Sequence, residues 1–69
     1  MENMVHFFDG NNPGVIFVGT EADMIAMDNE GGNAMRWKGN PPVGGTIEVK
    51  IESKTGNIKI EKWPVEKIG

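Results

Sequence analysis

The stretch Thr46-Ile47-Glu48-Val49-Lys50-Ile51-Glu52-Ser53-Lys54-Thr55-Gly56-Asn57-Ile58-Lys59-Ile60-Glu61 decides the fold expected of this chain. Isoleucine and valine alternate with charged residues on both sides of a polar segment. Alternation with a period of two is typical of strands that bury one face and expose the other. Gly56 and Asn57 tolerate the positive φ that a tight turn needs. The stretch therefore predicts an amphipathic β-hairpin.

The register of this hairpin follows from pairing apolar with apolar residues, because a shift of one residue moves every side chain to the other face. A three-residue loop would set Ile51 opposite Lys59 and is rejected on that ground. A four-residue loop over 54–57 gives three matched pairs: Ile51 with Ile60, Glu52 with Lys59, and Lys50 with Glu61. Each charged pair of opposite sign contributes roughly 0.2–1 kcal/mol. The sequence predicts the four-residue loop.

Length and composition limit what the chain can be. Its 69 residues predict a single domain over 1–69. A domain of ~60 residues buries only about 60% of its unfolded surface, so the core is small. The chain has no cysteine, and therefore no disulfide supplements that core. Self-association is expected to add stability.

Charge and targeting signals limit the expected partners and cellular location of the protein. Ten acidic and seven basic residues give a net charge of −3, and the lysines are interleaved with glutamates, as on a solvated face. Non-specific nucleic-acid binding depends on clustered Lys and Arg, so it is not expected. The chain start lacks the basic and apolar regions of a signal peptide. No apolar run reaches the roughly 18–20 residues of a membrane span, so a cytoplasmic protein without membrane contact is predicted.

Glycine- and proline-rich turns divide the rest of the chain into short apolar runs. The runs at 4–8, 15–18, 24–27 and 34–37 have strand length. With the hairpin, they predict a mainly β protein: a small single-domain barrel or sandwich, SH3-like or OB-like in scale, of five or six antiparallel strands.

The prolines add detail to this prediction. Pro41 and Pro42 predict an extended segment that crosses to the hairpin, because two prolines cannot lie in a central strand. Pro64 is expected to end the last long strand, which leaves 65–69 as a short return strand or a frayed tail.

Residues 20–30 allow two structures. Thr20 before Glu21, Ala22 and Asp23 resembles a helix N-cap, and Gly31 suits the position after a helix end. This gives the alternative α+β fold with one short helix at 20–30. A hairpin from 24 to 37 around the turn 29–33 is favoured, because 25–33 resembles 49–57 at a spacing of 24 residues.

Two motifs mimic ligand sites and are rejected. Residues 39–46 match a phosphate-binding loop except that Gly45 replaces the essential lysine, and two prolines remove backbone donors. Residues 9–14 resemble the start of a calcium-binding loop. However, Pro13 has no side-chain oxygen at the fifth loop position, and Thr20 replaces the bidentate glutamate required at the twelfth. Neither a metal nor a cofactor is predicted.

Catalytic side chains are scarce. His6 is the sole histidine, and it precedes Asp9 by three residues. Together they offer a possible general base, but the sole serine, Ser53, lies at the expected hairpin tip. An exposed or capping histidine is the preferred interpretation, and no enzyme activity is predicted.

Large side chains beside cations mark the candidate contact surface. Tryptophan and arginine are enriched at interface hot spots. In the predicted register Trp63 falls on the wet face opposite Glu48, whereas Trp37 shares the inner face of the favoured hairpin and is assigned to the core. The predicted contact residues are Trp63, Lys62, Arg36, Lys38 and Glu48.

These observations predict a small acidic, intracellular, non-catalytic binding protein of the inhibitor, accessory or phage type. It is expected to form a homo-oligomer through an edge strand or the Trp63 surface, or to bind a protein partner. An alternative is a small-ligand or nucleotide binder that uses Arg36, Lys38 and Trp63. A third is an enzyme that uses His6 and Asp9.

Overall fold

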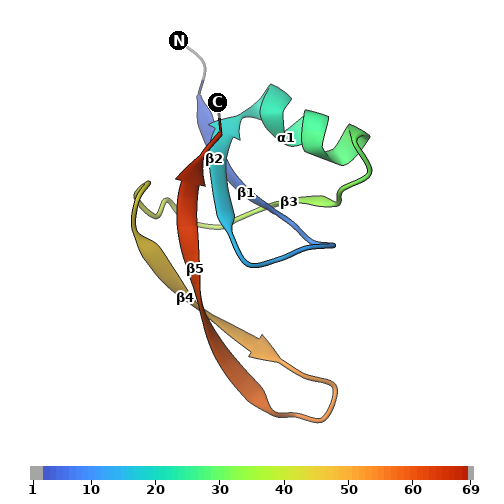
Figure 1. The fold of residues 1–69 in the computed structure, drawn as a ribbon, viewed down its shortest axis with the longest axis vertical. Coiled ribbons are helices and arrows are strands. Elements are labelled where there is room, and N and C mark those ends of the chain that lie inside the picture. The colour runs from blue at the N-terminus through green and yellow to red at the C-terminus, as the bar shows by residue number, and fades with distance from the viewer. Residues whose placement is uncertain (1–2, 69) are drawn as a thin grey trace.

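A computed structural model describes residues 3–68, which form five strands and one helix (Figure 1). In chain order these are β1 (Met4–Asp9), β2 (Ile16–Thr20), α1 (Glu21–Asn29), β3 (Ala34–Arg36), β4 (Thr46–Glu52) and β5 (Ile58–Lys67). The strands make one sheet in the order β3-β1-β2-β5-β4. The predicted mainly β class is confirmed. The sheet is open, with β3 and β4 at its edges, rather than closed into a barrel.

One neighbouring pair of strands contradicts the prediction of antiparallel strands only. β2 and β5 run parallel, with Ile16 beside Val65, while the other three pairs are antiparallel. Parallel neighbours need a long crossover connection, and everything from α1 to the end of β4 lies between these two strands. The order of the strands along the sequence does not reveal that β5 pairs with β2, so the parallel pair was not predicted.

Residues 21–29 form a helix, so the favoured hairpin over 24–37 and the strand at 24–27 are wrong. Thr20 Oγ1 accepts the Asp23 N–H at 3.2 Å, and the Asp23 carboxylate accepts the Thr20 N–H at 2.9 Å. This reciprocal capping box satisfies two helix-end donors, and such caps are typically worth about 1 kcal/mol. Gly31, at φ 94°, follows the helix end as the helical alternative required.

The two faces of the sheet bury different side chains. On one face, Ile16 and Val18 of β2 pack with Trp63 and Val65 of β5 in a buried cluster. Three β4 residues are half-buried against it, namely Ile47, Val49 and Ile51. On the other face, Phe7 is fully buried, with its ring 5.9 Å from that of Phe17. α1 lies on this second face (Figure 1).

The register of the β4–β5 hairpin differs by one residue from the prediction. Ile51 lies opposite Lys59 and Lys50 opposite Ile60, around the three-residue loop 54–56, so the predicted four-residue loop is wrong. The Ser53 N–H closes the loop on the Asn57 carbonyl at 2.9 Å.

The buried end of the hairpin explains this register. Trp63 lies opposite Ile47 and is only 4% exposed, so its predicted place on the wet face is wrong. Full burial of one large apolar side chain is worth about 1.5–3 kcal/mol. In the observed register Ile58 and Ile60 lie opposite charged residues, beyond the end of the core. The free energy gained by burying Trp63 and Val65 outweighs the loss of apolar partners for these two isoleucines.

Pro64 lies within β5 and does not end it. The Val65 N–H donates to the Gly45 carbonyl and the Val65 carbonyl accepts from Gly44, so both Val65 groups face the β4 side. Backbone groups of successive strand residues point to opposite sides, so Pro64 costs no hydrogen bond to β4. Residues 65–67 pair with β2, so they are neither a return strand nor a frayed tail. Gly69 lies outside the described residues.

The segment from 37 to 45 connects the two edges of the sheet without forming a strand, as Pro41 and Pro42 predicted. His6 Nε2 lies 3.0 Å from the Pro41 carbonyl and ties this segment to β1. Over residues 3–68, no helix is long and apolar enough to cross a membrane.

Candidate functional site

The distal part of the β4–β5 hairpin, residues 48–62, projects from the rest of the molecule and is called the arm below (Figure 1). The molecule measures 43 × 26 × 16 Å along its principal axes. β4 makes close backbone contacts with β5 and with no other helix or strand of residues 3–68. The arm is therefore a two-stranded ribbon that the body holds at one end.

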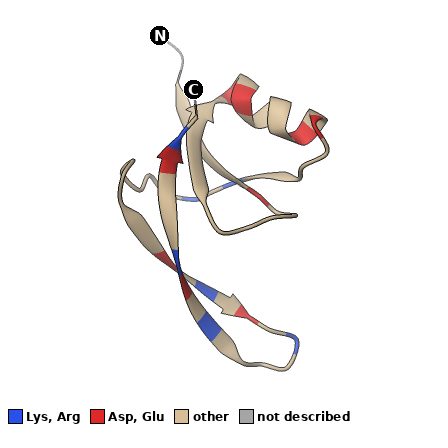
Figure 2. Cartoon of the chain, in the orientation of Figure 1, with Lys and Arg blue, Asp and Glu red and all other residues tan. Residues whose placement is uncertain are grey.

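The outer face of the arm carries two exposed isoleucines. Ile58 is 65% and Ile60 58% exposed, the highest values among the large apolar side chains of the described chain. They lie opposite Glu52 and Lys50, and the next pair along is Glu48 with Lys62. Charges of both signs thus border the isoleucines along the ribbon (Figure 2). Such an arrangement resembles an apolar contact patch with a polar rim.

The apolar side chains on the inner face of the arm are more buried than those on its outer face. Val49 and Ile51 pack toward the core cluster. Lys59 and Glu61 form an ion pair at 3.9 Å beside them, with the lysine side chain 76% exposed. An exposed pair of this kind contributes little to stability.

Among the described residues, no strand or backbone group pairs with the free edge of β4. The Ser53 N–H points to Asn57 and the Gly45 carbonyl to Val65, so odd-numbered residues of β4 face β5. Even-numbered residues, from Thr46 to Glu52, therefore direct their N–H and C=O groups to the open edge. An edge of this length is a template for another strand.

The five contact residues predicted from sequence do not form one site. Glu48 and Lys62 lie opposite each other on the outer face of the arm. Trp63 is buried beneath them and offers no indole surface to a partner. Arg36 lies on the α1 side of the sheet, and Lys38 is exposed in the segment after β3.

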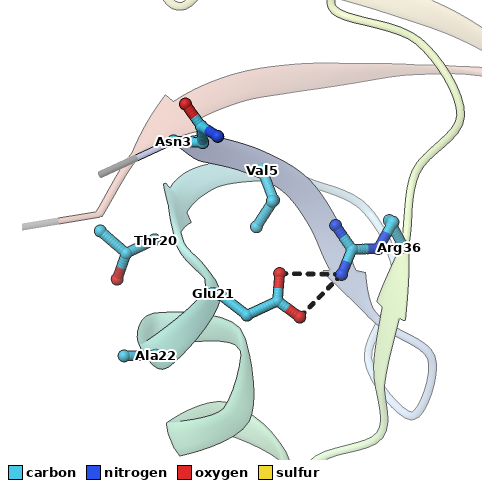
Figure 3. A pocket seen from close by; sticks show the side chains of 6 residues that line it. All are labelled: Asn3, Val5, Thr20, Glu21, Ala22 and Arg36. Carbon is cyan, nitrogen blue, oxygen red and sulfur yellow. Dashed lines mark hydrogen bonds and ion pairs between the residues drawn. The ribbon is translucent and has the colours of Figure 1, made fainter. Parts of the chain in front are cut away.

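Arg36 borders a surface pocket in the described part of the chain (Figure 3). This open pocket of about 450 Å³ is lined by Asn3, Val5, Thr20, Glu21, Ala22 and Arg36. Nη2 of Arg36 donates to both carboxylate oxygens of Glu21 at 2.8 Å. The cation is thus paired within the chain, so the pocket has no free charge to attract an anion.

The nucleotide-binding alternative gains no support from these positions. Trp63 belongs to the core on one face of the sheet, while Arg36 pairs with Phe7 on the other. Arg36, Lys38 and Trp63 therefore share no surface on which a base and a phosphate could both bind. This alternative stays a prediction.

His6 and Asp9 also lie apart. Asp9 follows His6 by three positions on β1, so their side chains leave opposite faces of the strand. His6 Nε2 lies against the Pro41 carbonyl, while Asp9 Oδ1 accepts the backbone N–H groups of Asn11 at 2.9 Å and Asn33 at 3.1 Å. Both side chains hold loops in place. Within residues 3–68, no three His, Asp or Glu side chains gather as a metal site.

Trp37 was assigned to the core, and it packs half-buried against the core cluster. Its ring centroid lies 6.2 Å from Trp63 and 6.1 Å from Phe8. The buried Nε1 of Trp63 has no hydrogen-bond partner among the described protein atoms.

The sequence pattern placed Ile58 and Ile60 on the buried face, and their exposure was therefore not predicted. A signal was present: in the predicted register, Lys62 fell on the apolar face and Trp63 on the wet one. That misfit shows that the apolar pattern of β5 changes side between residues 60 and 63.

No protein family, curated protein or solved structure matches this chain. The arm, with its exposed isoleucines and free edge, is the best candidate for a binding surface among the described residues.

Proposed function

We propose that the protein is a small, acidic, non-catalytic interaction protein, of the inhibitor or accessory type, that binds other protein chains through its arm. The observation that carries this proposal is the exposure of Ile58 and Ile60, at 65% and 58%. Both lie on the outer face of the arm, where they have no place in the core cluster of the described residues. Contiguous exposed apolar residues rimmed by polar ones mark interaction sites in soluble proteins.

The energetics favour binding over folding as the role of these side chains. They contribute little to the stability of the free chain, because they remain largely in water. A partner that covered them would gain about 25 cal/mol for each Å² of apolar surface removed from water. Charged neighbours such as Lys50 and Glu52 would then select among partners by charge.

The test is affinity capture from the native cell with the wild-type chain and the double variant Ile58→Thr/Ile60→Thr. Threonine keeps the β-branched shape that a strand prefers but removes apolar surface, so partners enriched by the wild type should be lost. A photo-reactive residue at position 60 should cross-link the same partners.

A matched control removes two similarly exposed apolar side chains outside the arm. Ile25 in α1 is 51% and Val43 52% exposed, so Ile25→Thr/Val43→Thr should keep the captured partners. Equal loss in both double variants, or full retention by the arm variant, would refute the proposal. Thermal melts of all three chains confirm that each one folds.

A further inference from the structure

We infer that the free edge of β4 pairs with the same edge of a second copy, antiparallel and centred on Val49. The inference rests on the proposed role of the arm as an interaction surface, and it names the partner as this chain itself. It is carried by the free edge and by the charge pattern of β4.

Only one edge of the sheet has the length for such pairing. β3, at the opposite edge, has three residues, whereas β4 has seven. The backbone N–H and C=O groups at the free β4 edge belong to even-numbered residues, because the backbone hydrogen bonds of Ser53 and Gly45 point toward β5. An antiparallel partner must therefore set even-numbered residues opposite even-numbered ones, which leaves a few registers.

Charge selects among these registers. Centring on Lys50 sets Lys50 opposite its own copy and Glu48 opposite Glu52 twice. Centring on Glu48 sets Glu48 opposite its own copy. Like charges directly opposite each other destabilise a strand pair. Centring on Ile51 sets residues 46–48 against the loop 54–56 of the other copy, which is not a strand.

Centring on Val49 satisfies every position of the strand. Glu48 then lies opposite Lys50 of the second copy, and Lys50 opposite Glu48. On the inner face, Ile47 lies opposite Ile51 twice, and the two Val49 residues meet on the two-fold axis. All seven residues of β4 pair, since Thr46 lies opposite Glu52.

The symmetry of this contact limits the assembly to two chains. A two-fold contact uses the same surface on both copies and closes on itself. Both free edges are consumed, and the product is a continuous ribbon in the order β5-β4-β4-β5. The outer faces of the two arms, with Ile58 and Ile60, stay exposed on this ribbon.

The first test is the mass of the full chain in solution, measured by native mass spectrometry and sedimentation. The wild type should be a dimer. Glu48→Lys and Lys50→Glu each create two like-charge pairs, so each variant should weaken self-association about tenfold or more. An equimolar mixture of the two variants restores both opposite-charge pairs and should form a heterodimer.

Matched controls carry the same changes of charge elsewhere. Glu30→Lys at the end of α1 and Lys54→Glu in the hairpin loop lie outside β4 and should leave the dimer unchanged. Association of the mixed variants shows that both single variants are folded. A wild type that stays monomeric to millimolar concentration, or a mixture that fails to associate, overturns the inference.

The second test locates the centre of the contact and uses the absence of native cysteine. Facing residues of an antiparallel pair have Cα atoms about 4.5–5.5 Å apart, within the range of a disulfide. Oxidised Val49→Cys should form a covalent dimer, whereas Ile51→Cys should not, because its two copies lie four positions out of register. Efficient cross-linking of Ile51→Cys instead would refute the Val49 centre.

The two proposals can fail separately. If the wild type is monomeric but Ile58→Thr/Ile60→Thr abolishes partner capture, the arm binds other proteins and the inferred dimer is wrong. If the charge-swapped mixture dimerises but the isoleucine variant captures the wild-type partners, the proposed contact face is wrong and the dimer stands.

Discussion

The two halves of β5 differ in which face carries their apolar side chains. Trp63 and Val65 point to the inner face and are 4% and 2% exposed, whereas Ile58 and Ile60 point to the outer face and are mostly exposed. The pairing with β4 is continuous through both halves. The change of side therefore lies in the sequence of β5, and no bulge produces it.

This difference shows where the chain supplies its own partner and where it does not. The inner half of β5 contacts β2, β4 and the aromatic side chains of Phe8 and Trp37. Its distal half contacts β4 alone. Apolar residues in the first half stabilise the fold, and those in the second are available to another chain.

The largest expected effect tests the buried half. Trp63→Ala should lower the free energy of unfolding by about 3–5 kcal/mol, because it leaves a large cavity in the core. Domains of this size have roughly 3–10 kcal/mol in total, at about 0.05–0.15 kcal/mol per residue. The variant should therefore be largely unfolded or close to it, as urea titration followed by circular dichroism would show.

Ile60→Ala is the matched change in the exposed half of the same strand. It should change the free energy of unfolding by less than about 0.5 kcal/mol, as is usual for surface positions. Similar losses for the two variants would contradict the distinction between the halves of β5.

An intermediate effect tests whether the arm unfolds together with the body. Gly56 has φ 84° at the arm tip, while Asn57 does not have a positive φ. Gly56→Ala should cost about 1–2 kcal/mol of strain, and Asn57→Ala should cost less. Because β5 is one continuous strand, the loss should appear in global unfolding. An unchanged global transition with lost amide protection in 48–62 would show that the arm opens independently.

A smaller effect concerns the body. Thr20→Ala removes the hydroxyl that accepts the Asp23 N–H, and it should lower the free energy of unfolding by about 1 kcal/mol. The change should lower the melting temperature without altering the proposed self-association, since α1 makes no contact with β4. Loss of the dimer in this variant would place the contact elsewhere than β4.

Local sequence was enough for several features of the fold. The alternation in 46–52 and 58–61 predicted two strands and an intervening turn, and Pro41 with Pro42 predicted an extended crossing segment that is not a strand. Thr20 and Gly31 also carried the signals of a helix start and end. Their physical basis is local, because caps, turns and face alternation depend on neighbours within a few residues.

The candidate site was predicted only in part. Of the predicted contact residues, Glu48 and Lys62 lie on the outer face of the arm and Trp63 lies in the core. Ile58 and Ile60 were expected on the buried face and lie on the outer one. The error came from treating every apolar residue of the hairpin as buried within this chain. Which part of β5 reaches the core depends on where β2 docks.

By itself, the sequence determined that the chain is mainly β, contains an amphipathic hairpin and turns at its glycines. Only the tertiary structure decided the register of that hairpin, the parallel pairing of β2 with β5, and the choice of helix over hairpin at 20–30. Each of these is a competition between alternatives that are locally similar in energy. Burial of Trp63 and Val65 against Ile16 and Val18, residues more than forty positions away, decides the first two, and no local pattern encodes contacts at that distance.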